Sequence, residues 1–376
     1  MRIALVAPLA EAVPPKLYGG TERVVSWLAD ELVRQGHRVT LFASAESETA
    51  AELVVCAAQS LRLAGVRDHL GSTLAMLRKV RRHVDDFDII HFHVDLLPQA
   101  LFHELAHKCL VTLHGRLDSP DTLPLYKAYP EMPLVSISHA QRRPMPADSN
   151  WLATIPHGLV SHVCPFNPQG GSYLAFLGRI SPEKRPDRAI EIAKRAGIPL
   201  KLAAKVDAVD LEYFETEIEP LLDHPLIEFI GEIDETQKCE FLGNARALLF
   251  PIDWPEPFGL VMIEAMSAGT PVIAWPNGSV PEVITEGVSG TMVNSIEAAV
   301  EAVQQAAYMD RRKVRAEFEK RFTAARMARA YVAAYRALLS HVSATARLPA
   351  VAMPAVAARE VHWLGSELRG KAAGRS

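Results

Sequence analysis

Two carboxylates that lie eight residues apart, Glu256 and Glu264, are the strongest candidates for ligand binding in this chain of 376 residues. Pro257 disfavours a helical conformation at Glu256, which should therefore lie in a loop, whereas Glu264 should lie about one turn inside the next helix. The backbone N–H groups of Phe258 and Gly259 would form an anion site beside them. Two hydrogen-bond acceptors that flank an anion site suit a ligand with hydroxyl groups at both ends and phosphate between, which is the layout of a sugar nucleotide. Either acid could instead be solvated, but the apolar neighbours of Glu264 predict a partner for its charge.

Two predicted elements would hold these acids in place. Residues 247–251 form an apolar run that predicts a buried strand, and residues 260–268 have an apolar helical pattern that Gly269 and Pro271 end. The acids therefore belong to a strand-to-helix turn, which is where parallel sheets bind their ligands.

A second group with ligand-binding chemistry is basic. Arg179 and Lys184 follow a strand predicted at residues 173–177 and precede a helix predicted at residues 186–196. At the carboxyl end of a strand, a guanidinium and an ammonium group could clamp a diphosphate. The alternative is a solvated basic turn, and the position directly after a strand argues against it.

Three further polar side chains end predicted strands: His93, His114 and Ser138. They should lie near the same crevice, because the carboxyl ends of parallel strands meet at one edge of a sheet. For each of them, an ordinary polar residue at a strand end is the alternative.

A glycine pair follows the first predicted strand, in Tyr18-Gly19-Gly20-Thr21. The glycines would allow close approach of the backbone to a ligand, and Thr21 could cap the following helix. The segment is not G-x-G-x-x-G, so the dinucleotide fingerprint is absent, and a flexible turn is the alternative.

A rival enzyme class is suggested by His103-Glu104-Leu105-Ala106-His107. On a helix, H-E-x-x-H places two histidines on one face to bind zinc and supplies a glutamate as the base, as in zinc peptidases. The residues that follow are predicted as a strand and carry no extension with a third ligand, which counts against a peptidase.

A possible metal motif, the D-x-D string of Asp86 and Asp88, precedes its strand and should lie at the opposite end of the sheet from the crevice. We therefore expect solvated turn residues there, and no bound metal.

The order of predicted elements indicates parallel sheets covered by helices on both faces, because apolar strands alternate with helical patterns. In the first half, strands are expected at residues 3–7, 38–43, 53–56, 89–93, 109–114, 134–138 and 152–155, with helices at 21–35 and 72–84. In the second half, strands are expected at 173–177, 200–204, 227–230, 247–250, 271–274 and 291–293, with helices at 296–307, 311–321 and 325–339.

Composition narrows the class of protein. A hydrophobic content of 49% and a charged content of 22% are ordinary for a globular chain, and the length predicts two domains. The net charge of −4 gives no general attraction to nucleic acid, and no apolar stretch reaches the 18 residues of a membrane span. The four cysteines lack the spacing of a metal site and are expected to be reduced thiols of a cytosolic protein: Cys56, Cys109, Cys164 and Cys239.

Several motifs together resemble one family, the family-4 retaining glycosyltransferases, over residues 1 to about 339. The segment from Glu256 to Leu260, with Glu264, is similar to the E-x7-E motif of that family. Ile155-Pro156-His157-Gly158-Leu159-Val160 is similar to the I-P-N-G-V-D segment of the family. Gly178-Arg179, with Glu183-Lys184, is similar to its G-R-x-x-x-E-K motif. The loop 275–282 is similar to its glycine-rich loop.

This resemblance implies an α/β architecture, the GT-B fold, in which two Rossmann-like doubly wound domains face a central cleft. Residues 1–163 would form the acceptor side and residues 172–322 the nucleotide-sugar donor side. Residues 323–341 would form a helix that crosses back to the first domain, and residues 343–376, rich in Ala, Pro, Arg and Gly, are expected to be a disordered tail.

The resemblance also implies an activity. A hexosyl group would move from a nucleotide diphosphate sugar, a UDP- or GDP-sugar, to a carbohydrate, lipid-linked or small-molecule acceptor, with retention of configuration and without a metal or other cofactor. The protein would be cytoplasmic, and peripheral contact with the inner face of the membrane stays open. A nucleotide-sugar epimerase of the same fold and a sugar-nucleotide sensor without activity are the alternatives within the fold.

Roles for single residues come from the same resemblance. Glu256 would bind hydroxyls of the donor sugar, Glu264 the ribose, and His114 the sugar, while Arg179 and Lys184 would neutralise the leaving diphosphate in place of a metal. The residues expected at the donor are Gly20, Arg179, Lys184, Glu256, Phe258, Gly259, Leu260 and Glu264, with Gly19, His93, Ser138 and Glu282 as weaker candidates.

The chain departs from the family pattern at three positions. His157 replaces an asparagine and Val160 an aspartate, and Ser279 stands where a second glycine is common. Roles that relatives give to the first two positions are therefore in doubt here. Glu282, the last residue of the loop 275–282, is expected to support the loop and not to contact the ligand.

Overall fold

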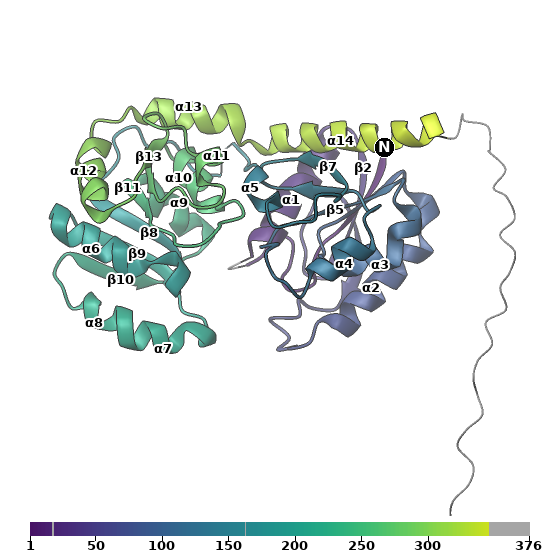
Figure 1. Cartoon of the computed structure of the whole chain (residues 1–376), viewed down its shortest axis with the longest axis horizontal. Coiled ribbons are helices and arrows are strands. Elements are labelled where there is room, and N and C mark those ends of the chain that lie inside the picture. Colours follow the sequence, from purple (N-terminus) through teal and green to yellow (C-terminus); the bar gives the residue numbers. More distant parts are fainter. Residues whose placement is uncertain (17–18, 162, 346–376) are drawn as a thin grey trace, which may run out of the picture.

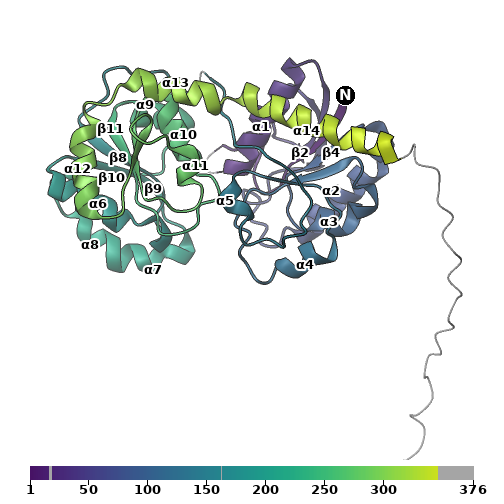
Figure 2. The ribbon, with the colours of Figure 1, turned by 45° about the horizontal axis from the view of Figure 1, so that its top comes forward.

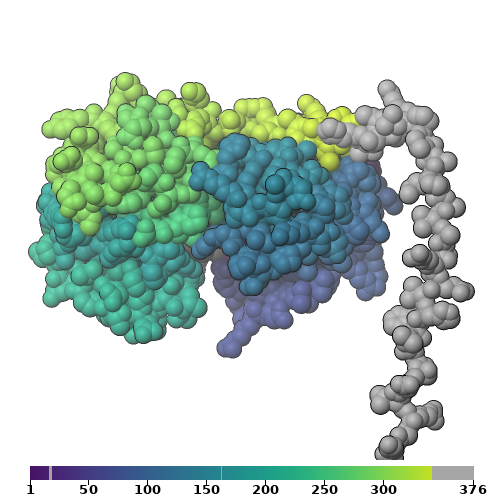
Figure 3. Space-filling model, viewed as in Figure 1, coloured from purple at the N-terminus to yellow at the C-terminus, as the bar shows by residue number. Residues whose placement is uncertain are grey.

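The computed structural model describes residues 1–16, 19–161 and 163–345, and it consists of two α/β units that lie side by side (Figure 1). Figure 3 shows them as two lobes, with the helix α14 (Ala324–Thr345) across the N-terminal lobe. Each unit contains one parallel sheet, as the alternation of strands and helices predicts.

The sheet of the N-terminal unit is formed by β1 (Arg2–Val6), β2 (Arg38–Ser44), β3 (Glu52–Ala57), β4 (Ile89–Phe92), β5 (Cys109–Thr112), β6 (Leu134–Ser136) and β7 (Trp151–Thr154). The strands lie in the order β3-β2-β1-β4-β5-β6-β7 and are all parallel. The order reverses between β1 and β4, which opens a crevice at their carboxyl ends.

Helices cover both faces of this sheet: α1 (Gly20–Arg34), α2 (Leu70–Arg82), α3 (Leu97–Phe102), α4 (Leu123–Ala128) and α5 (His139–Arg142). Successive residues of β1 point to opposite faces, as in any strand. Ile3 and Leu5 join one core with α1 and α14, whereas Ala4 and Val6 join a second core with α2 and α3.

The sheet of the C-terminal unit is formed by β8 (Tyr173–Arg179), β9 (Leu200–Lys205), β10 (Ile227–Gly231), β11 (Ala245–Phe250), β12 (Val272–Ala274) and β13 (Gly290–Met292). The order β10-β9-β8-β11-β12-β13 reverses between β8 and β11. The helices are α6 (Pro186–Ala196), α7 (Leu211–Tyr213), α8 (Glu219–Leu222), α9 (Glu235–Gly243), α10 (Leu260–Ser267), α11 (Val280–Val283), α12 (Ile296–Ala306) and α13 (Arg311–Arg321).

Helix α14 belongs to the N-terminal unit in space although it follows the C-terminal unit in sequence. It packs on α1 (Figure 2), and its Tyr331 and Tyr335 are completely buried in the core that also contains Ile3. The helix continues to Thr345, past the boundary expected at residue 343, and the rest of the expected tail, 346–376, lies outside the described residues. No helix in the described part of the chain is long and apolar enough to cross a lipid bilayer.

The cysteine prediction is wrong for one pair. Cys164, in the segment between the two units, forms a disulfide with Cys239 of α9, whereas Cys56 and Cys109 are free. The Cα atoms of the pair lie 4.9 Å apart, within the range that a disulfide requires. A separation of 75 residues hides this proximity in the sequence, and the cysteines no longer argue for a reducing compartment.

Two local predictions at strand and helix ends also differ from the structure. Helix α1 begins at Gly20 with Gly19 as its N-cap, so Thr21 lies inside the helix and does not cap it. Leu17 and Tyr18 lie outside the described residues. Strand β5 ends at Thr112, which places His114 two residues beyond it in a loop.

Candidate active site

A cleft of about 580 Å³ lies between the two units, beside the reversals of strand order in both sheets. All the residues expected at the donor line this cleft, and so do Gly19 and His114. The cleft is also lined by residues that carried no predicted role, among them Glu22, Arg62, His157, Glu235 and Lys238.

Glu256 lies in the loop between β11 and α10, as predicted, and it is only 8% exposed. Its carboxylate accepts hydrogen bonds from Lys184 Nζ at 2.5 Å and from Trp254 Nε1 at 3.0 Å. Lys184 Nζ also lies 4.4 Å from the centre of the Trp254 ring, a cation–π contact. The half-buried ammonium group of Lys184 therefore neutralises the buried carboxylate of Glu256 at one wall of the cleft.

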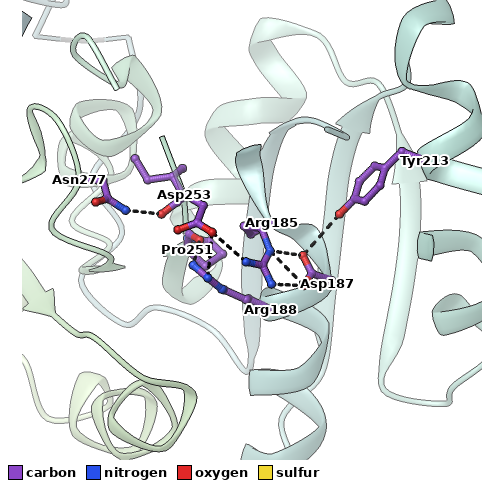
Figure 4. A network of polar contacts seen from close by, with 8 residues as sticks. Arg185, Asp187, Arg188, Tyr213, Pro251, Asp253 and Asn277 are labelled. Atoms are coloured by element: carbon purple, nitrogen blue, oxygen red, sulfur yellow. Dashed lines mark hydrogen bonds and ion pairs between the residues drawn. The ribbon is translucent and has the colours of Figure 1, made fainter. Parts of the chain in front are cut away.

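Lys184 is held in place by the turn that follows β8. The next residue, Arg185, has a φ of 54°, in the left-handed region that non-glycine residues rarely occupy. Its guanidinium binds Asp187 at 2.7 Å and Asp253 at 3.0 Å (Figure 4). The backbone N–H of Asp253 donates to the carbonyl of Glu183 at 2.8 Å. These contacts join the turn with Lys184 to the loop between β11 and α10.

Glu264 is the fifth residue of α10 and is 6% exposed. The partner that its burial predicts is Lys238 of α9, whose Nζ lies 2.6 Å away. Lys238 also contacts Glu235 at 3.0 Å, and Glu235 pairs with Arg23 of the N-terminal unit at 2.9 Å. A line of alternating charges therefore connects the two units. The capping box that starts α9 is readable in the sequence, but the direction in which Lys238 points is not.

Arg179 lies in the cleft but is surrounded by acids. Its guanidinium contacts Glu183 at 2.5 Å, Asp210 at 3.2 Å and Asp207 at 3.7 Å. Burial raises the pKa of the Asp210 carboxyl above its usual value. A diphosphate would have to compete with three carboxylates for this guanidinium, whereas Lys184 has one such partner among the described residues.

The segment 255–259, which we call the cleft loop, carries two unbound amides. Neither the N–H of Phe258 nor that of Gly259 has an acceptor among the residues that the structure describes. Gly259 has a φ of 78°, and a Cβ there would lie 2.7 Å from the Cε of Met262. Glycine is therefore required at this position, and the N–H groups remain available for an anion, as the sequence predicts.

Histidine rings are stacked on the N-terminal side of the cleft. His93 Nδ1 and His114 Nε2 share a hydrogen bond of 2.8 Å, and the His157 ring stacks on His114 with centroids 5.2 Å apart. Burial lowers the pKa of His114 to about 3 and lowers the pKa values of His93 and His157 well below 6.5, so the stack is neutral. The second nitrogen of His114 is buried without a partner among the described residues. A hydrogen bond from His114 to a sugar would require the ring to turn.

Three weaker candidates, His93, Ser138 and Glu282, do not line the cleft. His93 is buried behind His114, whereas Ser138 and Glu282 join the units. Ser138 Oγ donates to the carbonyl of Pro257 at 2.7 Å. The Glu282 carboxylate accepts hydrogen bonds from the backbone N–H groups of His139 and Ala140 at 2.7 and 2.6 Å. The prediction that Glu282 supports its own loop is wrong, because α11 faces α5 of the other unit, a relationship that sequence does not reveal.

The zinc-peptidase interpretation is also wrong. Residues 103–105 form a 3-10 turn and not the helix that H-E-x-x-H requires. His103 pairs with Glu131 at 3.2 Å, and Glu104 pairs with Arg81 at 3.3 Å. In the described part of the chain, no three His, Cys, Asp or Glu side chains are grouped to hold a metal ion.

The D-x-D string precedes β4, as predicted, at the end of the strand away from the cleft. Asp88 binds Arg2 at 2.8 Å, and Asp86 binds His83 at 3.0 Å. Both acids are therefore engaged in contacts near the protein surface.

Both halves of the chain match models of glycosyltransferase families. Residues 18–179 match the model "Glycosyltransferase Family 4", and residues 165–323 match the model "Glycosyl transferases group 1". The fold is similar to that of AviGT4, a glycosyltransferase involved in avilamycin A biosynthesis, with a TM-score of 0.69 and 24% identity over 90% of this chain and 98% of that chain. Sucrose-phosphate synthase from Thermosynechococcus elongatus gives a TM-score of 0.74 with 19% identity over 91% and 100% of the two chains.

The chain is a GT-B glycosyltransferase. Curated relatives of this glycosyltransferase include the phosphatidyl-myo-inositol mannosyltransferase of Mycobacterium leprae, which is 26% identical over 325 residues that cover 80% of this chain and 85% of the relative. The protein of the same name from Mycolicibacterium smegmatis is 28% identical over 324 residues, which cover 78% and 81%. The glycosyltransferase is thus aligned with these relatives over most of both chains.

Proposed function

We propose that this glycosyltransferase transfers a hexosyl group from a nucleoside diphosphate sugar with retention of configuration at the anomeric carbon. The observation that carries the proposal is the Lys184–Glu256 pair, 2.5 Å apart, in the same cleft as the unbound amides of Phe258 and Gly259. The carboxylate can accept hydrogen bonds from sugar hydroxyls, and the ammonium group and the two N–H groups can bind the diphosphate of a sugar nucleotide. Retention is proposed from the resemblance of the E-x7-E segment to family 4.

In this proposal, protein cations stabilise the leaving group. As the bond between the anomeric carbon and the phosphate oxygen breaks, negative charge grows on the diphosphate, while the carbon forms its new bond to the acceptor oxygen. Lys184, Arg179 and the amides of the cleft loop would stabilise that charge. We propose that these groups take the place of a metal ion.

The nucleoside end of the donor would lie near Glu264. Its carboxylate lines the cleft and, with Lys238 at 2.6 Å, offers an acceptor beside a donor. The cis-diol of a ribose presents hydroxyls that both donate and accept hydrogen bonds, so it suits this pair.

For the acceptor, we propose a lipid-linked polyol or sugar at a membrane surface. The two curated relatives carry phosphatidyl-myo-inositol in their names. In this chain, five exposed apolar side chains belong to β3, α2 and the segment that joins them: Val55, Leu63, Val66, Leu70 and Leu74 are 38–49% exposed.

Basic residues continue the same face of α2. Leu70, Leu74, Arg78 and Arg81 recur at helical spacing, so they lie along one side of the helix, and both arginines are exposed. Apolar side chains next to arginines suit the boundary between lipid tails and anionic headgroups. We propose that this face rests on an anionic membrane while the cleft receives a headgroup.

The central test is a donor screen followed by a transfer assay. Thermal shift with UDP- and GDP-hexoses should identify one donor that raises the melting temperature, because a ligand that binds the native state stabilises it by mass action. Transfer from that donor to lipid acceptors in vesicles should then give a product with the donor's anomeric configuration. Release of an altered free sugar without an acceptor would indicate an epimerase and contradict the proposal.

A flotation assay tests the membrane face separately. The wild-type enzyme should float with vesicles that contain phosphatidylglycerol, and Leu70→Asp with Leu74→Asp should abolish flotation while it leaves transfer to a water-soluble acceptor intact. Equal flotation of wild type and variant would remove the membrane face from the proposal.

A further inference from the structure

A closed ring of hydrogen bonds connects the two units around the cleft loop. In the C-terminal unit, Ser279 binds the loop twice: its backbone N–H donates to the carbonyl of Glu256 and its Oγ donates to the carbonyl of Phe258, both at 2.9 Å. In the N-terminal unit, Ser138 Oγ donates to the carbonyl between them, that of Pro257, at 2.7 Å. Three successive carbonyls are therefore held from both sides of the cleft.

The ring is completed by Glu282, three residues after Ser279. Its carboxylate binds the N–H groups of His139 and Ala140, the two residues directly after Ser138. Ser138 Oγ in turn accepts from the N–H of Gln141. Any separation of the units must therefore break the contacts of Glu282 and of Ser138 together.

Buried hydrogen bonds hold the residues of this ring in place. Ser138 and Ser279 are 2% and 0% exposed, so water competes little for their hydrogen bonds. The backbone of Glu282 and of Val283 is held by Arg321 of α13, which donates to both carbonyls. Glu282 is thus presented to the other unit from a fixed support.

Fixing these carbonyls also orients the amides that follow them. In a trans peptide the C=O and the next N–H point in opposite directions. With the carbonyl of Pro257 turned to Ser138, the N–H of Phe258 points away from that serine. With the carbonyl of Phe258 turned to Ser279, the N–H of Gly259 points away from Ser279. These are the two amides without an acceptor among the described residues, and both residues line the cleft.

We propose that Glu282 and Ser279 are positioning residues, which close the two units on the cleft loop and aim its amides at the anion of the substrate. The identity of the anion as a nucleoside diphosphate rests on the proposed function above. The claim that closure of the two units orients the amides rests only on the ring of hydrogen bonds. The hydroxyl of Ser279 supplies the hydrogen bond to the carbonyl of Phe258, which a residue without a polar side chain could not make.

The test compares Glu282→Gln, Glu282→Ala and Ser279→Ala with a matched control, Glu286→Gln. Glu286 also accepts a hydrogen bond from a backbone N–H, that of Met292 at 2.9 Å, but both partners belong to the C-terminal unit. Inorganic pyrophosphate serves as the anion probe, small-angle scattering reports the separation of the units, and steady-state kinetics with the donor from the screen give kcat and KM.

Glu282→Ala should increase the radius of gyration and lower both pyrophosphate affinity and kcat by roughly 10-fold or more, because a displacement of about 1 Å from the productive geometry can cost on the order of 10²-fold in rate. Glu282→Gln, which keeps one acceptor oxygen, should lie between the alanine variant and wild type. Ser279→Ala should lower kcat and pyrophosphate affinity without expansion, because the contact between units remains. Glu286→Gln should match wild type, because its contact lies within the C-terminal unit.

Two results would overturn the inference. In the first, Glu282→Ala scatters like wild type and keeps its kcat. In the second, both Ser279→Ala and Glu282→Ala bind pyrophosphate as tightly as Glu286→Gln does. Failure of the proposed function would give a different result. The wild type would transfer no hexose, yet pyrophosphate affinity and scattering would still depend on Glu282. That result would support the positioning role of the ring and refute the assigned reaction.

Discussion

Glu264 and Lys238 lie 2.6 Å apart, so the acid for which the family resemblance implies a contact with the ribose has its counter-charge on a neighbouring helix. Glu256 has the same relationship to Lys184, at 2.5 Å. Each carboxylate of the E-x7-E segment is therefore held by one lysine. In the proposed donor complex, the sugar and ribose hydroxyls would compete with the two lysines for these carboxylates.

The two acids should differ in their kinetic effects. Glu256→Gln should lose most transfer activity, because it removes the charged partner of Lys184 beside the reacting sugar. Glu264→Gln should mainly raise the KM for the donor, by a factor that corresponds to roughly 1.5–3 kcal/mol for a hydrogen bond to a charged group. Steady-state kinetics with varied donor measure both effects, and wild-type constants for both variants would refute the assignment.

Loss of Lys184 should lower kcat and not merely raise KM. The charge on the leaving diphosphate grows in the transition state, and removal of one preorganised electrostatic contact commonly costs on the order of 10²–10³ in rate. Lys184→Ala and Arg179→Ala are measured at saturating donor. Lys201→Ala is the control, because Lys201 pairs with Glu228 at 3.0 Å and does not line the cleft. If kcat of both test variants stays within about threefold of wild type, the two side chains bind the ground state and the transition state equally well, and the proposed stabilisation of the leaving group is wrong.

Gly158→Ala should destabilise the fold by about 1–3 kcal/mol, the cost of overpacking a tight contact. A Cβ at Gly158 would lie 2.3 Å from the carbonyl oxygen of Thr323, where the chain returns to the N-terminal unit. Gly71→Ala is the control: it lies in α2 with nothing within 4 Å of its Cβ position, so stability should stay constant or rise by up to about 1 kcal/mol. Urea unfolding measures both, and equal midpoints would contradict the prediction.

Acidification should destabilise the enzyme well before its carboxylates titrate. Burial lowers the pKa values of His91, His93, His114 and His157, whereas an unfolded histidine has a pKa of about 6.5. Below that pH the unfolded chain binds protons that the native state does not, so stability falls as the pH falls. Each such histidine costs about 1.4 kcal/mol per pH unit.

Urea midpoints at pH 7.5 and 5.5 measure this effect, and the midpoint at pH 5.5 should be clearly lower. His157→Asn should reduce the proton uptake on unfolding by about one proton, and so flatten the dependence. A stability that is constant between the two pH values would show that the imidazole stack is hydrated in solution.

The sequence predicts the sheets and the residues of the cleft well because both depend on local signals. Apolar runs define the strands, and polar residues such as Lys184 follow those runs directly, so topology brings them to one edge. Contacts between distant segments leave no such signal. Three contacts depend on how the helices pack: the disulfide between Cys164 and Cys239, the hydrogen bonds of Glu282 to the other unit, and the ion pair of Lys238 with Glu264. The alternation of strands and helices in the sequence does not encode this packing.

The return of α14 to the first unit has a consequence for the order of synthesis. Tyr331 and Tyr335 fill the core that also contains Ile3, so a ribosome that has completed β1 to β7 has made a sheet with one face still lacking its last helix. Nascent chains shorter than about 345 residues would therefore present an apolar surface to chaperones, although their first sheet was complete long before. Maturation of the N-terminal unit would thus wait until α14 has been synthesised. Arrest of synthesis between the two units would yield a fragment that cannot close its own core.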